Sequence, residues 1–339
     1  MSNKFDILYL NKQEVIDLGG GDMKLAIEDM EEVLSLRSKG ETITPHKVAM
    51  GFGKTIDDEV AFGRINAMPG YVKGKYNMAG IKWIGSNPKN VERGIPRASG
   101  ITIINDPDTK FPVAIMDGTI ISAARTGAIG GVAVKYLSKN DSKIVTLIGA
   151  GVQNRTQLEA AVCTRPSINE IYVYDLYYDR AVNFADEMSK KLNRSITPIK
   201  SLEEYCKKSD IIITATVSKE PIVEADWIMP GTTCINVGGY EYTFDAVRKA
   251  QKVVVDTWED VKHRMASTIA IMANEGLFAD EEIYAEIGEI VIGDKIGREN
   301  DQEIIYYNSV GMGIEDVAIA TRVYRTAQEK GIGTKLIYW

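Results

Sequence analysis

The feature that most constrains the fold is a glycine-rich turn between an apolar strand-like run and a helix. Residues 143–154 read KIVTLIGAGVQN, and a second apolar run, EIYVYD, ends at Asp175. Further runs rich in β-branched residues follow downstream: DIIITAT, TCINVGG and KVVVD. Continuous runs of this kind are typical of strands that are covered on both faces. We therefore predict a doubly wound parallel sheet, a Rossmann domain, from Ser142 onward.

The turn itself has the chemistry of a dinucleotide-binding loop. Gly149 permits a tight turn, Gly151 lets the backbone approach a pyrophosphate, and the N-terminus of the next helix offers unpaired N–H groups to that anion. Asn154 stands where the usual fingerprint has its third glycine or alanine. Asp175 would accept hydrogen bonds from ribose hydroxyls and repel a 2′-phosphate, which favours NAD over NADP, although the nearby Arg180 keeps NADP open. The alternative is a purely structural turn followed by a surface aspartate.

The segment before this sheet has a different pattern. Its apolar runs FGRINAMPG, MAGIKWIGSN, GITIIND and FPVAIMDG are separated by turn residues, which predicts a mixed or antiparallel sheet after a helix over residues 23–40. The run VGMGIEDVAIATRVYRTAQEKG has helical periodicity and is expected to fold back onto this first domain. We therefore expect a discontinuous α+β substrate and dimerisation domain over residues 1–122 and 310–339, with the Rossmann domain over 123–309.

Composition limits the partners and the location. The net charge of −7 argues against a nucleic acid or a membrane surface as partner, and no apolar run approaches the roughly 20 residues of a membrane span. The start of the sequence lacks a signal segment, so we expect a cytoplasmic protein. Cys163, Cys206 and Cys234 are scattered and are expected to be small core residues, with neither a disulfide nor a zinc site. His46 and His263 are too few and too far apart to suggest a metal cluster.

Three cations in apolar or helical contexts are the strongest candidates for substrate binding. Arg64 and Lys82 each lie within a strand-like run, where a charge is costly unless it is paired or serves a ligand. Arg64 can bind a carboxylate through two N–H groups, and Lys82 can polarise or protonate a carbonyl or imine. Arg125 lies near the start of a helix, where the dipole disfavours a cation unless an anion is near. The alternative is that Arg64 and Lys82 point to solvent from edge strands.

The combination of GRINAMP, GIKWIGSNP, AARTGA, IGAGVQ, INVGG and NSVGMGIEDV, in this order, resembles the ornithine cyclodeaminase/μ-crystallin family over nearly the whole chain. The resemblance implies NAD(P)-dependent chemistry at an amino or imino carbon and a homodimer. It also implies that the substrate is contacted by Arg64, Met68, Lys82 and Arg125. The cofactor residues that it implies are Arg125, Thr126, Gly149, Gly151, Val152, Gln153, Asp175, Ala215, Thr216, Asn236, Val237 and Ser309.

One position departs from the cyclodeaminase pattern. Members with that activity have an aspartate directly after the glycine pair of INVGG, placed to handle the amine and the leaving ammonia. Here the chain reads GGYEY, so Tyr240 takes that place and Glu241 comes next. A one-residue shift would let Glu241 act as the proton acceptor, and we therefore expect Lys82 and Glu241 to be the catalytic pair.

A second resemblance lies within the family. The runs WIGSNPKNVERGIPRASGITIINDPDT and IGDKIGRENDQEIIYYNSVGMGIEDV are similar to the branch that oxidatively cleaves N-(2-amino-2-carboxyethyl)-glutamate to 2,3-diaminopropionate and 2-oxoglutarate. That substrate carries three carboxylates, and Lys89, Arg93 and Arg97 add cations after Lys82. We expect Arg93 and Arg97 to bind the substrate, at least one of them through a distal carboxylate; the alternative is that the run is solvated surface. The alternatives are a cyclodeaminase-type lyase that recycles NAD internally, an imino-acid reductase or alanine dehydrogenase, and a crystallin-like binding protein.

Overall fold

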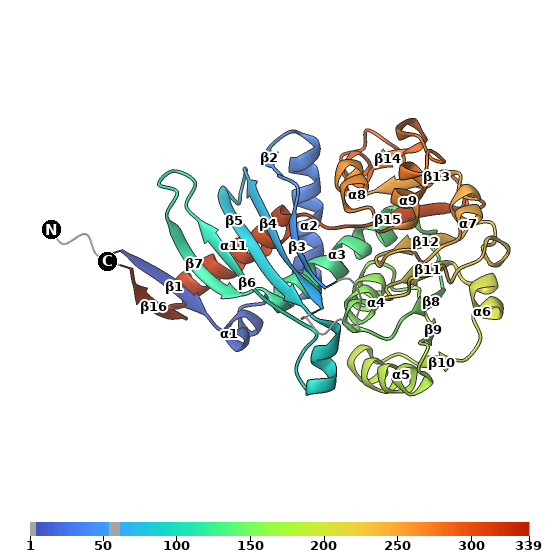
Figure 1. The fold of residues 1–339 in the computed structure, drawn as a ribbon, viewed down its shortest axis with the longest axis horizontal. Helices are drawn as coiled ribbons and strands as arrows, with labels where there is room; N and C mark the ends of the chain where they lie inside the picture. The colour runs from blue at the N-terminus through green and yellow to red at the C-terminus, as the bar shows by residue number, and fades with distance from the viewer. Residues whose placement is uncertain (1–4, 54–61, 339) are drawn as a thin grey trace. The chain divides into compact units, whose positions relative to one another are not determined.

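The computed structural model describes residues 5–53 and 62–338, and the chain divides into two compact units. Unit 1 comprises residues 1–125 and 312–339, and unit 2 comprises residues 126–311. Helix α3 (Thr119–Leu137) carries the chain from the first unit into the second. Both units combine sheets with helices, which confirms the predicted α/β class (Figure 1). No described helix has the length and apolar character that crossing a membrane requires.

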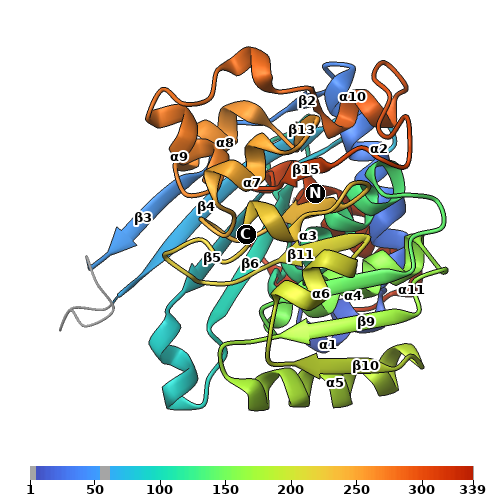
Figure 2. The same ribbon diagram turned by 90° about the vertical axis from the view of Figure 1, so that its right-hand side faces the viewer.

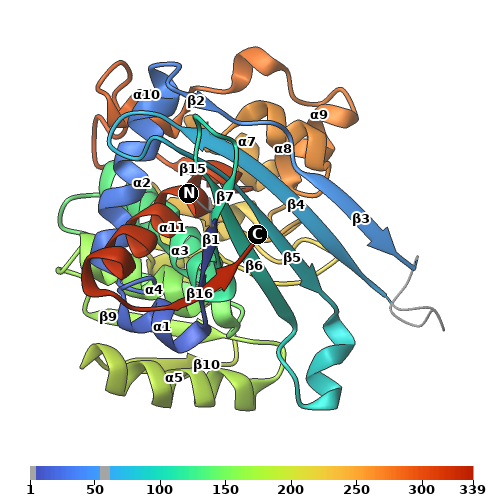
Figure 3. The same ribbon diagram turned by 90° about the vertical axis from the view of Figure 1, so that its left-hand side faces the viewer.

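Unit 1 is built on one mixed sheet. Its strands are β1 (Asp6–Leu10), β2 (Thr42–Ile43), β3 (Val48–Phe52), β4 (Gly63–Val72), β5 (Met78–Ser86), β6 (Ala98–Asn105), β7 (Pro112–Asp117) and β16 (Thr334–Ile337). The order is β16-β1-β7-β6-β5-β4-β2, with β3 paired to β4, and only the β1–β7 pair is parallel. Figure 3 shows β3, β4, β5 and β6 side by side. The expectation of a mixed sheet is confirmed, while β1, β2, β3 and β16 had no prediction.

Helices cover one face of this sheet. They are α1 (Lys12–Asp17), α2 (Met23–Ser38), the first part of α3 and α11 (Gly313–Lys330), and a 3₁₀ helix, η1 (Pro88–Arg93), links β5 to β6. Helix α11 packs across β4, β5 and β6 (Figure 1). The buried row beneath it consists of Met68, Lys82 and Thr102, which are direct cross-strand partners. This row places Lys82 on the covered face of the sheet.

Two glycines allow α11 to approach the sheet closely. A Cβ on Gly70 would lie 2.8 Å from Ile314, and a Cβ on Gly313 would lie 2.4 Å from the carbonyl oxygen of Pro69. Neither contact is tolerated by a real side chain. The first turn of α11 therefore lies directly on β4, and the acidic residues that follow, Glu315 and Asp316, are carried into the buried layer.

Unit 2 is built on a parallel sheet, as predicted. Its strands are β8 (Ile144–Ile148), β9 (Glu170–Tyr174), β10 (Ile196–Ile199), β11 (Ile211–Thr214), β12 (Thr233–Asn236), β13 (Lys252–Val255), β14 (Ala285–Glu286) and β15 (Ile305–Asn308). The order is β10-β9-β8-β11-β12-β15-β13-β14 and every pair is parallel (Figure 2). Strands β11, β12, β13 and β15 are buried throughout, because helices and loops cover both faces.

The helices of unit 2 connect these strands. They are α4 (Val152–Thr164), α5 (Tyr178–Leu192), α6 (Glu203–Lys208), α7 (Phe244–Arg248), α8 (Trp258–Arg264), α9 (Thr268–Asn274) and α10 (Ile287–Val291), with short 3₁₀ turns at η2 (Ala225–Trp227) and η3 (Asp280–Glu282).

Two features of unit 2 differ from expectation. Strand β15 lies between β12 and β13, a position that no sequence pattern indicated. Cys206 and Cys234 are buried and free as expected, but Cys163 is exposed on α4, so its assignment to the core was wrong. Helix α4 turns only part of its surface to the sheet, and Cys163 lies on the other part.

Candidate functional site

Lys82 is the most enclosed of the cations that the structure describes in unit 1. Its side chain is 1% exposed, and its Nζ lies 2.9 Å from Asp316 Oδ2 and 3.1 Å from Ser122 Oγ, to which it donates a hydrogen bond. The alternative that this lysine points to solvent is therefore wrong. Strand β5, helix α3 and helix α11 each supply one of the three side chains.

Two further charges complete this buried cluster. Arg125 Nη1 lies 2.8 Å from Glu315 Oε2, and its Nε lies 3.5 Å from Asp316 Oδ2. The cluster thus holds two cations, Lys82 and Arg125, and two carboxylates, Glu315 and Asp316, each of them almost wholly buried. Pairing of this kind is what makes four buried charges tolerable.

The surroundings of Lys82 shift its proton affinity into the range of acid–base catalysis. Burial and the positive charge of Arg125 lower the pKa of Lys82 to about 8, against the opposing effect of Asp316 and Glu315. An amine with this pKa can both accept and release a proton near neutral pH. The geometry and the charge balance together make Lys82 a candidate general acid or base.

Two polar atoms beside Lys82 have unused hydrogen-bonding capacity. Thr102 Oγ1 and Asp316 Oδ1 are buried, and neither has a hydrogen-bond partner among the described residues. Buried polar atoms are normally satisfied, so an unsatisfied pair at one place calls for an explanation. A polar group of a bound small molecule would supply it.

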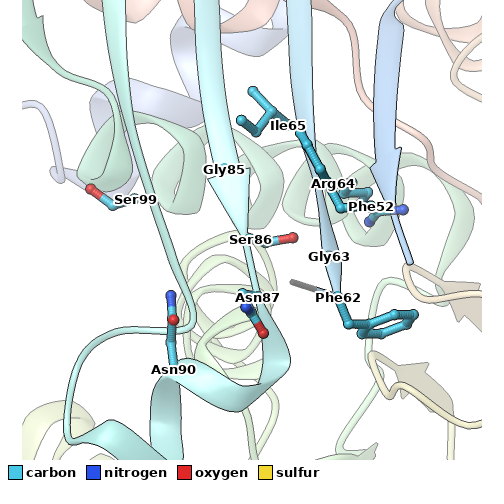
Figure 4. A pocket seen from close by; sticks show the side chains of 10 residues that line it. All are labelled: Phe52, Phe62, Gly63, Arg64, Ile65, Gly85, Ser86, Asn87, Asn90 and Ser99. Atoms are coloured by element: carbon cyan, nitrogen blue, oxygen red, sulfur yellow. The ribbon is translucent and has the colours of Figure 1, made fainter. Parts of the chain in front are cut away.

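Arg64 lies on the same face of β4 as Met68 but near the end of the strand, where it is exposed. It lines a cavity of about 390 Å³ with Phe52, Ser86 and Asn87 among its neighbours. Figure 4 shows Asn87 and Asn90 of the segment after β5 and Ser99 of β6 around the same space. A guanidinium beside amide and hydroxyl groups can bind a carboxylate.

The other two predicted arginines differ in their surroundings. Burial and the nearby charge of Arg64 lower the pKa of Arg97, although the residue, like Arg93, is exposed at the surface. Two guanidiniums that repel each other are better accommodated when an anion lies near both. Arg93, the last residue of η1, is exposed. Among the described residues, neither Arg93 nor Arg97 lines the cavity at Arg64.

In unit 2 the glycine-rich turn lies between β8 and α4. Gly149 has a φ of 99°, and a Cβ there would lie 2.8 Å from the carbonyl oxygen of Ala215, so both its conformation and its packing require glycine. Gly151 has a φ of −84°, and a Cβ there would have no neighbour within 4 Å. Neither the backbone nor the packing explains Gly151, whereas a phosphate held against the turn would.

Asn154 has its own function in the turn. It is fully buried, and its Nδ2 donates to the carbonyl oxygens of Ile148 and Gly149 at 2.9 and 2.6 Å. The asparagine therefore fixes the turn by hydrogen bonds. In the usual fingerprint the third glycine allows the helix to pack closely against its neighbour. Here a different glycine allows close packing, between α3 and α4: a Cβ on Gly127 would lie 2.6 Å from Thr156.

Asp175 follows β9 and reaches back to the turn. Its Oδ2 accepts a hydrogen bond from the N–H of Ala150 at 2.9 Å, and its Oδ1 accepts from the N–H of Tyr177 at 3.0 Å. The side chain is partly exposed, so the carboxylate can still meet a ligand. Arg180, the cation that would favour the 2′-phosphate of NADP, lies with its guanidinium over the ring of Tyr177.

The remaining predicted cofactor residues of unit 2 follow the same edge of the sheet. Because all its strands are parallel, their carboxyl ends meet at one edge, the usual place for a ligand. Five residues follow or end β11, β12 and β15: Ala215, Thr216, Asn236, Val237 and Ser309. Two others begin α4, Val152 and Gln153, and Val152 is 64% exposed. Thr126 lies on α3 and accepts a hydrogen bond from Gln157 through its carbonyl oxygen.

Glu241 lies at this edge but is fully enclosed. Its Oε2 accepts hydrogen bonds from Thr214 Oγ1 at 2.7 Å, Asn236 Nδ2 at 2.6 Å and the N–H of Gly238 at 3.0 Å, and its Oε1 accepts from the N–H of Thr216. Burial raises the pKa of this carboxyl, while hydrogen bonds from Thr214, Thr216 and Gly238 oppose the shift. A carboxylate with no exposed surface and four donors has no free position for a substrate proton. This geometry favours a structural role in place of the catalytic one expected for Glu241.

Several residues of these sites carried no prediction. Ser122, Glu315 and Asp316 were missed in unit 1, and Thr214 and Asp256 were missed in unit 2. The signal for Glu315 and Asp316 was an acidic pair inside an otherwise apolar helical run, MGIEDVAIA. Within residues 5–53 and 62–338, no group of three or more His, Cys, Asp or Glu side chains could hold a metal ion.

Replacing Glu241 with glutamine is expected to destabilise unit 2. The amide nitrogen would place a donor against one of the four donors, leaving buried groups unsatisfied at a cost of about 1–3 kcal/mol in the free energy of unfolding. Chemical denaturation followed by circular dichroism measures this. Glu220→Gln, at an exposed position of the same region, is the matched control. Equal stability of the Glu241 and Glu220 variants would contradict the structural role of Glu241.

Comparison with known proteins identifies the family. Residues 15–331 match the ornithine cyclodeaminase/mu-crystallin family. The N-((2S)-2-amino-2-carboxyethyl)-L-glutamate dehydrogenase of Staphylococcus aureus is 34% identical over 333 residues, 98% of each chain. The Delta(1)-pyrroline-2-carboxylate reductase of Thermococcus litoralis, solved with NADH and L-proline, is 38% identical, with a TM-score of 0.89 over 97% of this chain and 100% of that one. An archaeal alanine dehydrogenase dimer with bound NAD is 34% identical, with a TM-score of 0.89 over 99% of this chain and 100% of that one.

These similarities extend over nearly the whole chain and confirm the resemblance of the sequence motifs. The chain belongs to the ornithine cyclodeaminase/mu-crystallin family.

Proposed function

We propose that this protein is an NAD-dependent oxidoreductase acting on a C–N bond, and that it oxidatively cleaves N-(2-amino-2-carboxyethyl)-L-glutamate to 2,3-diaminopropionate and 2-oxoglutarate. The observation that carries the proposal is the buried Lys82 between Asp316 and Ser122, with a pKa of about 8. The similarity to the Staphylococcus aureus dehydrogenase supports the choice of substrate. Relatives that bind NAD or NADH support the choice of cofactor.

The reaction requires a base and then a water molecule. NAD, when bound, would supply the acceptor for the hydride that leaves the glutamate α-carbon, to which the secondary amine is bonded. Neutral Lys82 takes the proton of that amine as the C=N bond forms. Water then adds to the imine carbon, and the protonated Lys82 can return its proton to the departing amine, which leaves 2-oxoglutarate and 2,3-diaminopropionate. Arg64 and Arg125 are proposed to bind substrate carboxylates, and Met68 to pack against the carbon chain.

The residues present in unit 2 fit a dinucleotide. The open space above Gly151 admits a pyrophosphate, and the following α4 presents its N-terminal N–H groups. Asp175 provides the acceptor for ribose hydroxyls and disfavours a 2′-phosphate, so we propose NAD as the cofactor. Thr126, Val152, Gln153, Ala215, Thr216, Asn236, Val237 and Ser309 are proposed to line the site.

The test is NADH formation, followed by absorbance, with a panel of candidate substrates. We expect steady accumulation with N-(2-amino-2-carboxyethyl)-L-glutamate and NAD, and 2-oxoglutarate as a product. Turnover of L-alanine or L-proline in its place would favour the smaller-substrate enzymes among the relatives. Ammonia release from L-ornithine without NADH would indicate a closed redox cycle. Tight binding without turnover of any amino or imino acid would indicate a crystallin-like binding protein.

Gly151→Ala is expected to weaken NADH binding at least about tenfold without lowering the stability of the free protein, because only a ligand approaches this position. Gly149→Ala is the contrasting variant, since its φ of 99° and the nearby Ala215 carbonyl should lower stability by about 1–3 kcal/mol. Fluorescence titration with NADH and thermal unfolding separate the two effects. Unchanged affinity for NADH in Gly151→Ala would show that this turn does not bind the cofactor.

Arg97→Ala is expected to lower kcat/KM for the tricarboxylic substrate about ten- to a hundredfold, because a charge-assisted hydrogen bond to a distal carboxylate contributes about 1.5–3 kcal/mol. The proximity of Arg97 to Arg64 is the reason for choosing it. Arg93→Ala, at the exposed end of η1, tests in the same way the second arginine that is expected to bind the substrate. Steady-state kinetics on the tricarboxylate and on a small amino acid test this. Equal losses on both substrates would indicate that the arginines support the fold, and no loss in either variant would contradict the assignment.

We also propose a homodimer. The uncovered face of the unit 1 sheet carries a straight apolar row of cross-strand partners: Val48, Ala67, Trp83 and Ile101. Val48 is 63% exposed, and Trp83 and Ile101 are each 40% exposed. Exposed apolar surface of this extent usually marks an interface. The archaeal alanine dehydrogenase, which is a dimer, supports a second copy of this chain as the partner.

Trp83→Glu is expected to shift the protein from dimer to monomer, since it places a charge at the middle of the proposed interface. Light scattering coupled to size exclusion gives the mass directly. Ile296→Glu replaces another exposed apolar residue, in unit 2, and should leave the mass unchanged. A dimer that survives the Trp83 substitution would place the interface elsewhere.

A further inference from the structure

We propose that Asp316 and Ser122 are positioning residues for Lys82. Asp316 lies against Nζ as its ion-pair partner and Ser122 accepts a hydrogen bond from it, so that the third position on Nζ, which carries either the exchangeable proton or the lone pair, is the one directed at the substrate. This inference rests on the proposed function, because it assumes that Lys82 exchanges a proton with the substrate. Neither residue was among those predicted from the sequence.

The geometry of Nζ supports this assignment. A lysine amine has three positions besides its bond to Cε, and they rotate freely unless acceptors hold them. Here the carboxylate of Asp316 at 2.9 Å and the hydroxyl of Ser122 at 3.1 Å occupy two of the three. The two groups come from different helices, α11 and α3, so they approach Nζ independently. Whether Lys82 is charged or neutral, Asp316 and Ser122 take the same two positions around Nζ, and the third is left for the substrate.

The charges around Lys82 determine how readily that position releases its proton. The charged groups that face it are Asp316 and Glu315 from α11 and Arg125 from α3, while its cross-strand partners Met68 and Thr102 are uncharged. Burial and Arg125 favour the neutral amine, and the two carboxylates favour the ammonium. Without Asp316 the first two effects would dominate. Ser122 orients the amine of Lys82 through a hydrogen bond but adds no charge beside it.

The two roles give different results in variants. Asp316→Asn should lower the pKa of Lys82 from about 8 by about 1–3 units, because a carboxylate in direct contact is lost. Glu315→Gln should shift the pKa in the same direction by less, since its carboxylate pairs with Arg125. Ser122→Ala should leave the pKa nearly unchanged but lower kcat on the order of ten- to a hundredfold, because the amine is no longer aimed. Ser122→Thr, which keeps the hydroxyl, should restore kcat.

The pKa can be measured without substrate or cofactor. Protein labelled with ¹³C at lysine Cε is titrated by NMR, and the Lys82 resonance is identified by its loss in Lys82→Gln. The oxidative reaction needs the neutral amine, so kcat/KM should rise with pH through about 8 in the wild type and through a lower pH in Asp316→Asn. Agreement between the titration and the rate profile would support both the inference and the proposed function.

Each failure is distinguishable. An unchanged or raised Lys82 pKa in Asp316→Asn overturns the role of Asp316. Full kcat in Ser122→Ala, or no recovery in Ser122→Thr, overturns the role of Ser122. If Asp316→Asn does not fold, the two Ser122 variants decide the role of Ser122, and Asp316→Glu, which keeps the charge but displaces the carboxylate from Nζ, decides the role of Asp316: full kcat in Asp316→Glu overturns it. If no substrate is turned over, the proposed function fails, while the NMR titration still tests whether Asp316 controls Lys82.

Discussion

An ion pair enclosed between a sheet and a helix, Lys82 with Asp316, is the interaction on which unit 1 depends. Both side chains are almost wholly buried, and a buried charge that loses its partner costs about 3–5 kcal/mol. The pair therefore fixes the position of α11 along β5, and the neighbouring pair of Arg125 with Glu315 fixes α11 against α3. Close approach of α11 at Gly70 makes this geometry accessible. The buried charged residues of unit 1, which include the proposed catalytic lysine, therefore also hold α11 in place on the sheet and on α3.

Unit 2 uses buried carboxylates in a comparable way, but to shape loops. At the carboxyl edge of its sheet, backbone N–H groups leave the strand ladder and need other acceptors. Glu241 accepts from the loops after β11 and β12, and Asp256 Oδ2 accepts from Ser309 Oγ and from the N–H groups of Val310 and Gly311. Asn236 links the two regions through Tyr306, whose hydroxyl donates to it. The loops are consequently held by the interior of the unit, which leaves their outer surface available for a ligand.

Local patterns in the sequence identified the elements that depend on local physics. Continuous β-branched runs predicted β8, β9, β11, β12 and β13, and the isolated cation in an apolar run marked Lys82. What the sequence could not specify was set by contacts between distant segments. The insertion of β15 between β12 and β13, the pairing of Lys82 with Asp316 and the enclosure of Glu241 all depend on tertiary packing. Glu241 is the clearest case. The departure from the family pattern at Tyr240 suggested a catalytic role for Glu241, but in the fold this carboxylate accepts hydrogen bonds from four donors.

The discontinuity of unit 1 has a consequence for how the chain is made. Unit 2 is one continuous stretch, and it leaves the ribosome complete before the residues of α11 do. Arg125 and Glu315 lie 190 residues apart in the chain, so during synthesis Lys82 and Arg125 exist for a long interval without the acids that neutralise them. Contacts of such long sequence separation form late and slowly. The nascent first segment therefore stays incompletely folded, with Lys82 and Arg125 hydrated and not yet paired with Asp316 and Glu315, until α11 has been synthesised.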